Sequence, residues 1–166
     1  MPRFCRCCSI AVLLLAFLHH AGAQTFTLRQ LSDSLSVLTL RTDSTADYWR
    51  IPHPTYRFCT GDIDDDGKEE ALVGVVKKTR FHRETARRLF IYKNMAGRIR
   101  ALWMGSRLGG ILYDFRYVGG RVRSIETDKQ GFYYVAEYSW RKFGLSFEQF
   151  LAQKTTREEA FHHFTR

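Results

Sequence analysis

Residues 56–76 read YRFCTGDIDDDGKEEALVGVV, and this stretch decides how the rest of the chain is interpreted. Before the acidic run, Tyr56, Phe58 and Thr60 fall on one side of an extended chain. After it, Ala71 to Val76 form a short apolar run of the kind that is typical of a buried strand. The stretch therefore predicts two strands that are joined by an acidic turn.

Period-two alternation recurs along most of the chain and predicts further short strands in close succession. The dipeptide Gly119-Gly120 between two of them suits a two-residue hairpin turn with positive φ. The stripe of Phe132, Tyr134, Ala136, Tyr138 and Trp140 is expected to lie in the core. The fold class is thus expected to be mainly β, an antiparallel meander of sheets. The additional strands are expected at residues 34–41, 89–93, 98–104, 113–118, 121–126 and 131–140.

Three segments of the chain lack this clear alternation. A short C-terminal helix is predicted from Ser146 to Lys154, because Ser146 and Gln149 have the spacing of a capping box. Residues 155–166 are expected to be a charged, frayed tail. The basic segment from Lys77 to Arg88 is predicted to be a long surface loop, with one helical turn around residues 84–88 as the alternative.

The first 23 residues have the features of a secretory signal peptide. Arg3 and Arg6 precede a short apolar segment, Ile10 to Leu18, and Ala21-Gly22-Ala23 supply small residues for cleavage. The apolar segment is shorter than a membrane span, and no later segment is apolar enough, although an N-terminal anchor is the alternative. The protein is therefore expected to be exported and to reside in the periplasm, at the cell surface or outside the cell.

The remaining residues, 24–154 with their tail, are expected to form a single β-rich domain. Only Cys59 lies after the predicted leader, so no intrachain disulfide is expected and Cys59 is interpreted as a small buried hydrophobic residue. After removal of the predicted leader with Arg3 and Arg6, the chain has 24 Lys and Arg residues and 17 Asp and Glu residues, which gives a net charge of +7. An exported basic protein favours a glycan, an anionic lipid or a protein partner over nucleic acid, and plain solubility is the alternative.

The acidic turn has the spacing D-x-D-x-D-G-x-x-E, with carboxylates at Asp62, Asp64, Asp66 and Glu70. Calcium prefers six to eight hard oxygen ligands, and acids at every second position can converge on one centre. Gly67 permits the sharp turn, and the backbone carbonyl of Lys68 is expected to be a further ligand. Magnesium is the second candidate, and a solvated acidic turn without a metal is the alternative.

An EF-hand loop requires Glu at its twelfth position, where this chain has Val73, and strands rather than helices flank the turn. The segment from Gly61 to Gly74 instead resembles the FG-GAP/VCBS type of repeat of integrin-like β-propellers and exported bacterial proteins. That resemblance implies side-chain ligands at Asp62, Asp64, Asp66 and Glu70 and a carbonyl ligand at Lys68. A closed propeller needs four to eight blades, so a chain with one acidic turn predicts blade-like sheets without a complete propeller.

Two further clusters are candidates for function. Four arginines in or near the basic loop are a candidate anion-binding site, with a solvated surface as the alternative: Arg80, Arg83, Arg87 and Arg88. Asp114, Glu126 and Glu137 lie on expected strands, where a pair of carboxylates could act on a polysaccharide. No nucleophile elbow or phosphate-binding loop is found, so no catalytic residue is assigned and a non-enzymatic module is favoured.

Overall fold

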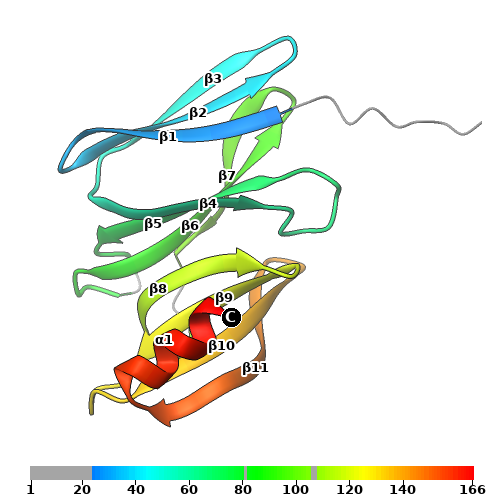
Figure 1. Cartoon of the computed structure of the whole chain (residues 1–166). Helices are drawn as coiled ribbons and strands as arrows, with labels where there is room; N and C mark the ends of the chain where they lie inside the picture. The colour runs from blue at the N-terminus through cyan, green and yellow to red at the C-terminus, as the bar shows by residue number, and fades with distance from the viewer. Residues whose placement is uncertain (1–23, 81, 106–107) are drawn as a thin grey trace, which may run out of the picture.

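A computed structural model describes residues 24–80, 82–105 and 108–166, so the predicted signal peptide lies outside the described residues. The described chain forms three antiparallel sheets and one short helix (Figure 1). The first sheet comprises β1 (Gln24–Ser32), β2 (Leu35–Thr42) and β3 (Ala46–Ile51). The second comprises β4 (Thr55–Gly61), β5 (Glu70–Lys77), β6 (Ala86–Met95) and β7 (Arg98–Met104). The third comprises β8 (Ile111–Val118), β9 (Arg121–Thr127), β10 (Tyr133–Arg141) and β11 (Gly144–Thr155), and α1 (Arg157–Thr165) follows it.

Every sheet is a meander in which consecutive strands pair with each other. The acidic turn joins β4 to β5, in the register that pairs Gly61 with Glu70. Gly119 and Gly120 both have positive φ, 58° and 77°, and make the predicted turn between β8 and β9. The mainly β, antiparallel architecture is therefore confirmed, and the described sheets do not form a complete propeller.

The sheets are stacked in chain order, and each interface is a separate hydrophobic cluster (Figure 1). Leu38 and Leu40 of the first sheet pack with Val73 and Tyr92 of the second. The other face of the second sheet packs against the third sheet through a second cluster that includes Leu72, Ile91, Phe115 and Ala136. The middle sheet is thus covered on both faces, which explains why six consecutive residues of β5 are buried.

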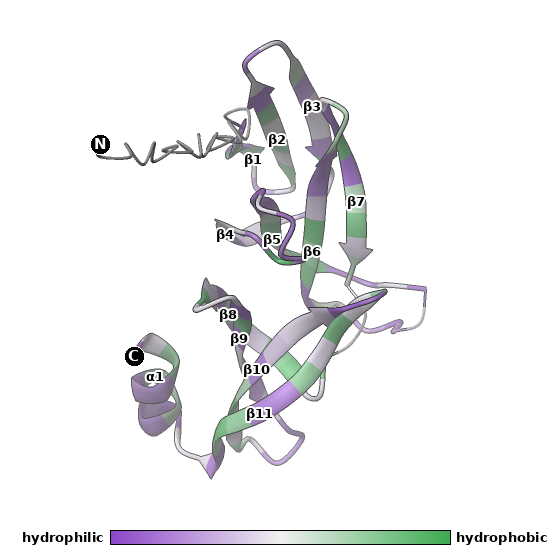
Figure 2. Ribbon diagram, turned by 90° about the vertical axis from the view of Figure 1, so that its right-hand side faces the viewer, coloured by the Kyte–Doolittle hydropathy of each residue, from purple (hydrophilic) through white to green (hydrophobic). Residues whose placement is uncertain are grey.

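The far face of the third sheet is covered by α1. Ile125 and Val135 pack there with Ala160 and Phe164 of the helix. Hydrophobic and hydrophilic segments alternate along β7 and β11 in Figure 2, as expected for strands whose successive side chains point to opposite faces. The stripe on β10 is only partly core, because Ala136 and Tyr138 are buried whereas Phe132 is 46% exposed.

The prediction of a helix from Ser146 to Lys154 is wrong, because this segment belongs to β11. The β strand is favoured by cross-strand aromatic pairs that a local pattern does not reveal. The ring of Phe147 lies 6.0 Å from that of Tyr138, and the ring of Phe150 lies 6.0 Å from that of Tyr134. The hairpin between β10 and β11 thus overrides the capping-box spacing.

The prediction of a frayed tail is also wrong, since residues 157–165 form α1. Thr156 caps the helix by accepting a hydrogen bond from the Glu159 amide, and the Glu159 carboxylate accepts one from the Thr156 backbone amide. At the other end, Arg116 donates to the carbonyl oxygens of Phe164 and Thr165, at 3.1 and 2.8 Å. The short C-terminal helix exists, but it begins eleven residues later than the spacing indicates.

The basic loop is shorter than predicted, because β6 already begins at Ala86. The alternative of a helical turn around residues 84–88 is wrong, since residues 86–88 are extended. Arg87 and Arg88 therefore lie on a strand, where consecutive side chains point to opposite faces. This placement separates two of the four candidate anion-binding arginines.

Candidate metal centre

The acidic turn begins where β4 ends and is shaped by its own first carboxylate. Asp62 accepts hydrogen bonds from the backbone amides of Asp66 and Gly67, at 3.0 and 2.8 Å. Gly67 has a φ of 82°, as the sequence predicts for the sharp turn. Asp65 has a φ of 59°, a conformation that a short polar side chain tolerates better than most. The turn is therefore a folded structure rather than an open loop.

Contacts to the neighbouring sheets hold the turn in place. The side chain of Ile63 is buried in the cluster between the second and third sheets. The hydroxyl of Tyr117, on β8, donates to the carbonyl oxygen of Asp62 at 2.5 Å. The side chain of Gln24, on β1, donates to the carbonyl oxygen of Glu69 at 2.6 Å. All three sheets therefore contact the segment that carries the acids.

Three of the predicted ligands meet at one point. Asp62, Asp64 and Glu70 each offer an oxygen within 4.8 Å of the others, and Glu70 is fully buried. One oxygen of Glu70 accepts a hydrogen bond from the Ile63 amide at 2.9 Å. Glu70 Oε1 and Asp64 Oδ1 are buried and have no hydrogen-bond partner in the described part of the chain. Two unsatisfied buried carboxylate oxygens in one cluster form a group that can hold a metal ion.

The electrostatics of this cluster show that its negative charge is compensated only in part. Burial, together with the nearby charges of Asp64 and Asp66, raises the pKa of Glu70 to about 7. The bond from the Ile63 amide and the charge of Lys93 act in the opposite direction and do not cancel this effect. An additional positive charge beside Glu70 would therefore favour its ionised form.

Asp66 is not one of the three converging acids, and the carbonyl ligand expected at Lys68 stays a prediction. Asp66 directs one oxygen to the Lys68 amide, at 3.0 Å, and the other to Lys93 Nζ, at 2.7 Å. The bond from Lys93 is the main reason why the pKa of Asp66 is lowered. Lys68 is exposed, and its backbone amide is engaged in this bond. Both carboxylate oxygens of Asp66 are therefore already bonded to groups of the chain.

Lys93, which sequence reasoning did not identify, is the cation of the cluster. Its Nζ lies 2.5 Å from Asp64 Oδ2, 2.7 Å from Asp66 Oδ2 and 3.6 Å from Glu70 Oε1. Although partial burial disfavours a charged ammonium, the bonds to Asp64 and Asp66 outweigh it and raise the pKa of Lys93. Ala71 pairs with Tyr92 across β5 and β6, so continuation of that register places Lys93 opposite Glu70. The pairing register of β5 and β6 is what would have identified Lys93. The period-two alternation of the sequence does not define that register.

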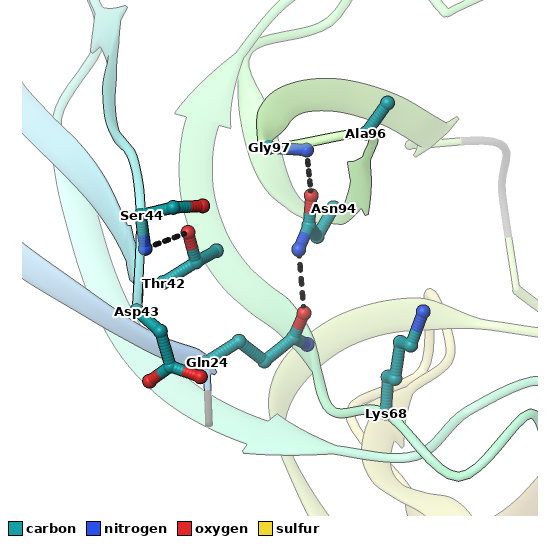
Figure 3. A pocket seen from close by; sticks show the side chains of 8 residues that line it. All are labelled: Gln24, Thr42, Asp43, Ser44, Lys68, Asn94, Ala96 and Gly97. Atoms are coloured by element: carbon teal, nitrogen blue, oxygen red, sulfur yellow. Dashed lines mark hydrogen bonds between the residues drawn. The ribbon is translucent and has the colours of Figure 1, made fainter. Parts of the chain in front are cut away.

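A polar cavity of about 280 Å³ lies close to the turn, between the first and second sheets. Figure 3 shows Asn94 between two partners in this cavity: its side chain donates to Gln24 and accepts from the Gly97 amide, both at 2.8 Å. The cavity is also lined by Lys68 and by the β2–β3 turn. Because Gln24, Asn94 and Gly97 bond to one another, their polar groups are satisfied, unlike those of the acidic cluster.

The candidate anion-binding arginines have different environments. The guanidinium of Arg87 lies 4.8 Å from the ring centres of both Tyr56 and Tyr113, so it is sandwiched between two aromatic side chains. Arg88 is buried and donates to the carbonyl oxygen of Glu84 at 3.3 Å. Arg83 and Arg88 line a cavity of about 480 Å³ together with Lys129. Arg80 is exposed. Anion binding at these residues stays a prediction.

The strand carboxylates Asp114, Glu126 and Glu137 are all buried and each has its own donors. Asp114 forms an ion pair with Arg57 of β4. Glu126 accepts hydrogen bonds from Ser124, at 2.6 Å, and Tyr138, at 2.8 Å. Glu137 lies on the opposite face of the third sheet, the face that α1 covers. These acids therefore hold elements together, and Glu137 cannot pair with the other two.

The ion pair of Glu137 predicts a pH-dependent contribution to stability. Burial disfavours the charged carboxylate, but bonds from Gln149 and Arg123, both at 2.9 Å, outweigh it and lower the pKa of Glu137 below its ordinary value of 4.5. Since the folded-state pKa is the lower one, the stabilisation is complete above pH 4.5 and is lost as the pH falls through the folded-state pKa.

At neutral pH, Glu137→Gln is expected to lower the free energy of unfolding by about 1.5–3 kcal/mol, the range for hydrogen bonds to a charged group. Urea unfolding of both proteins should show this difference at pH 7 and a smaller one at an acidic pH well below 4.5, where the carboxylate becomes protonated. An equal difference at the two pH values would contradict the assigned ion pair.

No helix among the described residues is long and apolar enough to cross a membrane. Cys59 packs beside the cluster between the second and third sheets, and burial raises the pKa of its thiol. Comparisons of the chain with protein-family models, with curated proteins and with solved structures find no match. The acidic cluster and its surroundings are therefore the basis on which a function is proposed.

Proposed function

We propose that the protein is an exported calcium-binding β module, with a structural or interaction role rather than a catalytic one. The ion is held in the turn between β4 and β5 by Asp62, Asp64 and Glu70. The observation that carries the proposal is the pair of buried oxygens, Asp64 Oδ1 and Glu70 Oε1, that lack a hydrogen-bond donor. Such groups are rare in folded proteins unless an ion or water satisfies them.

Calcium fits this group better than magnesium does. The donors are carboxylates on a turn, and calcium accepts six to eight oxygens in flexible geometry, whereas magnesium demands a near-ideal octahedron. The resemblance of residues 61–74 to the acidic turn of FG-GAP/VCBS repeats supports the same choice. Extracellular calcium modules bind with dissociation constants of about 10⁻⁴–10⁻³ M, which suits a protein with a predicted leader.

The place of the turn in the fold supports a structural role for the ion. Ile63 is anchored between the second and third sheets, and Tyr117 of the third sheet bonds to the carbonyl oxygen of Asp62. An ion held by Asp62, Asp64 and Glu70 fixes both ends of this segment. It thereby stabilises the contact between two sheets as well as the turn itself.

The outer strand of the third sheet supports an interaction role. Phe147 on this strand is 47% exposed, and Phe143, in the turn that precedes the strand, is 91% exposed. A protein or glycan partner of the exported module is proposed to use this edge, because exposed aromatic rings contribute strongly to both kinds of contact. No observation favours the alternative of an enzyme, since Asp114, Glu126 and Glu137 are engaged in internal contacts.

The test is thermal unfolding of the purified protein with a chelator and with calcium. Calcium at roughly 100 times its dissociation constant is expected to stabilise the protein by about 2.7 kcal/mol, because only the folded state binds it. Asp64→Asn should abolish this gain, whereas magnesium at the same concentration should give a smaller one.

Asp65→Asn is the matched control. It removes the same charge from the same turn, Asp65 is exposed, and asparagine also tolerates the positive φ of 59°. The control should keep the calcium-dependent gain. If wild type, Asp64→Asn and Asp65→Asn respond alike to calcium, the proposed site is wrong.

A further inference from the structure

We propose that the Lys93 ammonium is a tethered competitor of calcium, which neutralises the acidic cluster and has to leave it before an ion is held there. This inference rests on the proposed calcium function and concerns the regulation of the same site. According to this inference, the Lys93 ammonium leaves the acidic cluster when a calcium ion enters it.

The position of the ammonium carries the inference. Lys93 Nζ donates to Asp64 at 2.5 Å and to Asp66 at 2.7 Å, and it lies 3.6 Å from Glu70 Oε1. It thus contacts three of the four acids that the sequence singles out as calcium ligands. An ammonium and a calcium ion held by the same carboxylates repel each other at short distance, and a partly buried setting strengthens that repulsion.

The remaining oxygens show that Lys93 satisfies the cluster only in part. Asp64 Oδ1 and Glu70 Oε1 are buried and lack hydrogen-bond partners within residues 24–80, 82–105 and 108–166. An ammonium has three donors, so it cannot serve four carboxylates. A divalent ion with six or more coordination positions can use these oxygens as well. Lys93 therefore offsets part of the negative charge of the cluster, but it leaves two carboxylate oxygens without a partner in the described part of the chain.

The side chain of Lys93 is able to move away without a change in the backbone. It has a flexible four-carbon stem, and 18% of the side chain is exposed although the ammonium is bonded. Its departure would also free the Asp66 oxygen that it holds, so a fourth carboxylate could then join the other three. Lys93 thus lowers the affinity for calcium and sets the concentration at which the site responds.

Calcium titration by calorimetry on wild type and three variants tests this inference. Lys93→Met removes the ammonium and keeps the length of the side chain, so it is expected to bind calcium about tenfold more tightly, or better, within the usual range of coupling between ligands. Lys93→Arg keeps the charge and should stay close to wild type. Lys78→Met is the matched control, because Lys78 is an exposed lysine outside the acidic turn and takes no part in the ion pairs with Asp64, Asp66 and Glu70.

The two proposals fail in different ways. If wild type binds calcium and Lys93→Met binds it equally or less tightly, the competition is refuted and the calcium site stands. If neither wild type nor Lys93→Met binds calcium, the calcium function itself is refuted, and Lys93 is simply the permanent counter-ion.

A measurement on the wild-type protein tests the displacement without relying on the folding of a variant. The Lys93 ammonium, held by two carboxylates, should give a slowly exchanging ¹⁵N–¹H signal in the NMR spectrum. Saturation with calcium is expected to abolish that signal or to shift it to the position of a solvated lysine. A signal that is unchanged at saturation refutes the displacement.

Discussion

Replacing Phe115 with alanine is expected to lower the free energy of unfolding by about 3–5 kcal/mol, the usual cost of truncating a fully buried phenylalanine. Phe115 is on β8, has no exposed surface and lies in the cluster that joins the second and third sheets. Its ring meets that of Tyr56, on β4, edge to face at 6.2 Å. The cavity left by the substitution would therefore open at the interface on which the acidic turn depends.

Phe143→Ala is the matched control for this prediction. It makes the same chemical change in the turn between β10 and β11 of the third sheet, where the side chain of Phe143 is 91% exposed. Its effect should stay within about 0.5 kcal/mol, the usual range for a surface substitution. Urea unfolding of the two variants measures the contrast. Similar losses of stability would mean that the second and third sheets do not share a core.

The strands could be predicted from the sequence, because period-two alternation depends only on local order. The strand expected at residues 98–104 coincides with β7, and the one expected at 121–126 is one residue shorter than β9. The C-terminal errors have a common cause. β11 is stabilised by ring contacts to β10, and α1 by arginines of the third sheet, and neither contact is visible in the spacing of residues 144–165.

The division into three sheets could not be predicted. Alternation indicates that one face of a strand is buried, but it does not say against which element. Val135 and Ala136 point to opposite faces of β10, and both are buried, because α1 covers one face and the second sheet the other. Such layering is set by contacts between residues that are far apart in the sequence.

The candidate site shows the same limit. The spacing of acids within nine residues identified Asp62, Asp64 and Glu70, which the structure brings together. It could not identify Lys93, which lies 23 residues beyond Glu70 and reaches the cluster through the register of β5 and β6. Nor could it show that Asp66 is absent from the converging group and bonds instead to Lys93 and to the Lys68 amide.

Gly61→Ala is expected to cost about 3 kcal/mol, the upper part of the range for overpacking a well-filled core. Gly61 is the last residue of β4, immediately before the acidic turn. A Cβ atom at this position would overlap the ring of Tyr117 on β8. That ring cannot move freely, because the Tyr117 hydroxyl is bonded to the carbonyl oxygen of Asp62 at 2.5 Å. The glycine is thus required by the close approach of the third sheet to the turn.

A double-mutant cycle isolates this contact. Tyr117→Ala alone should destabilise the protein by removing the ring and its hydrogen bond, but Gly61→Ala should then cost much less, because the methyl group no longer meets an obstacle. The coupling between the two substitutions, measured by urea unfolding, is therefore expected to be at least about 1 kcal/mol in the compensating direction, as found for residues in contact. Simple additivity would show that the cost of Gly61→Ala arises elsewhere. Compensation would show that the ring of Tyr117 is the obstacle, and hence that the third sheet holds the turn through this contact.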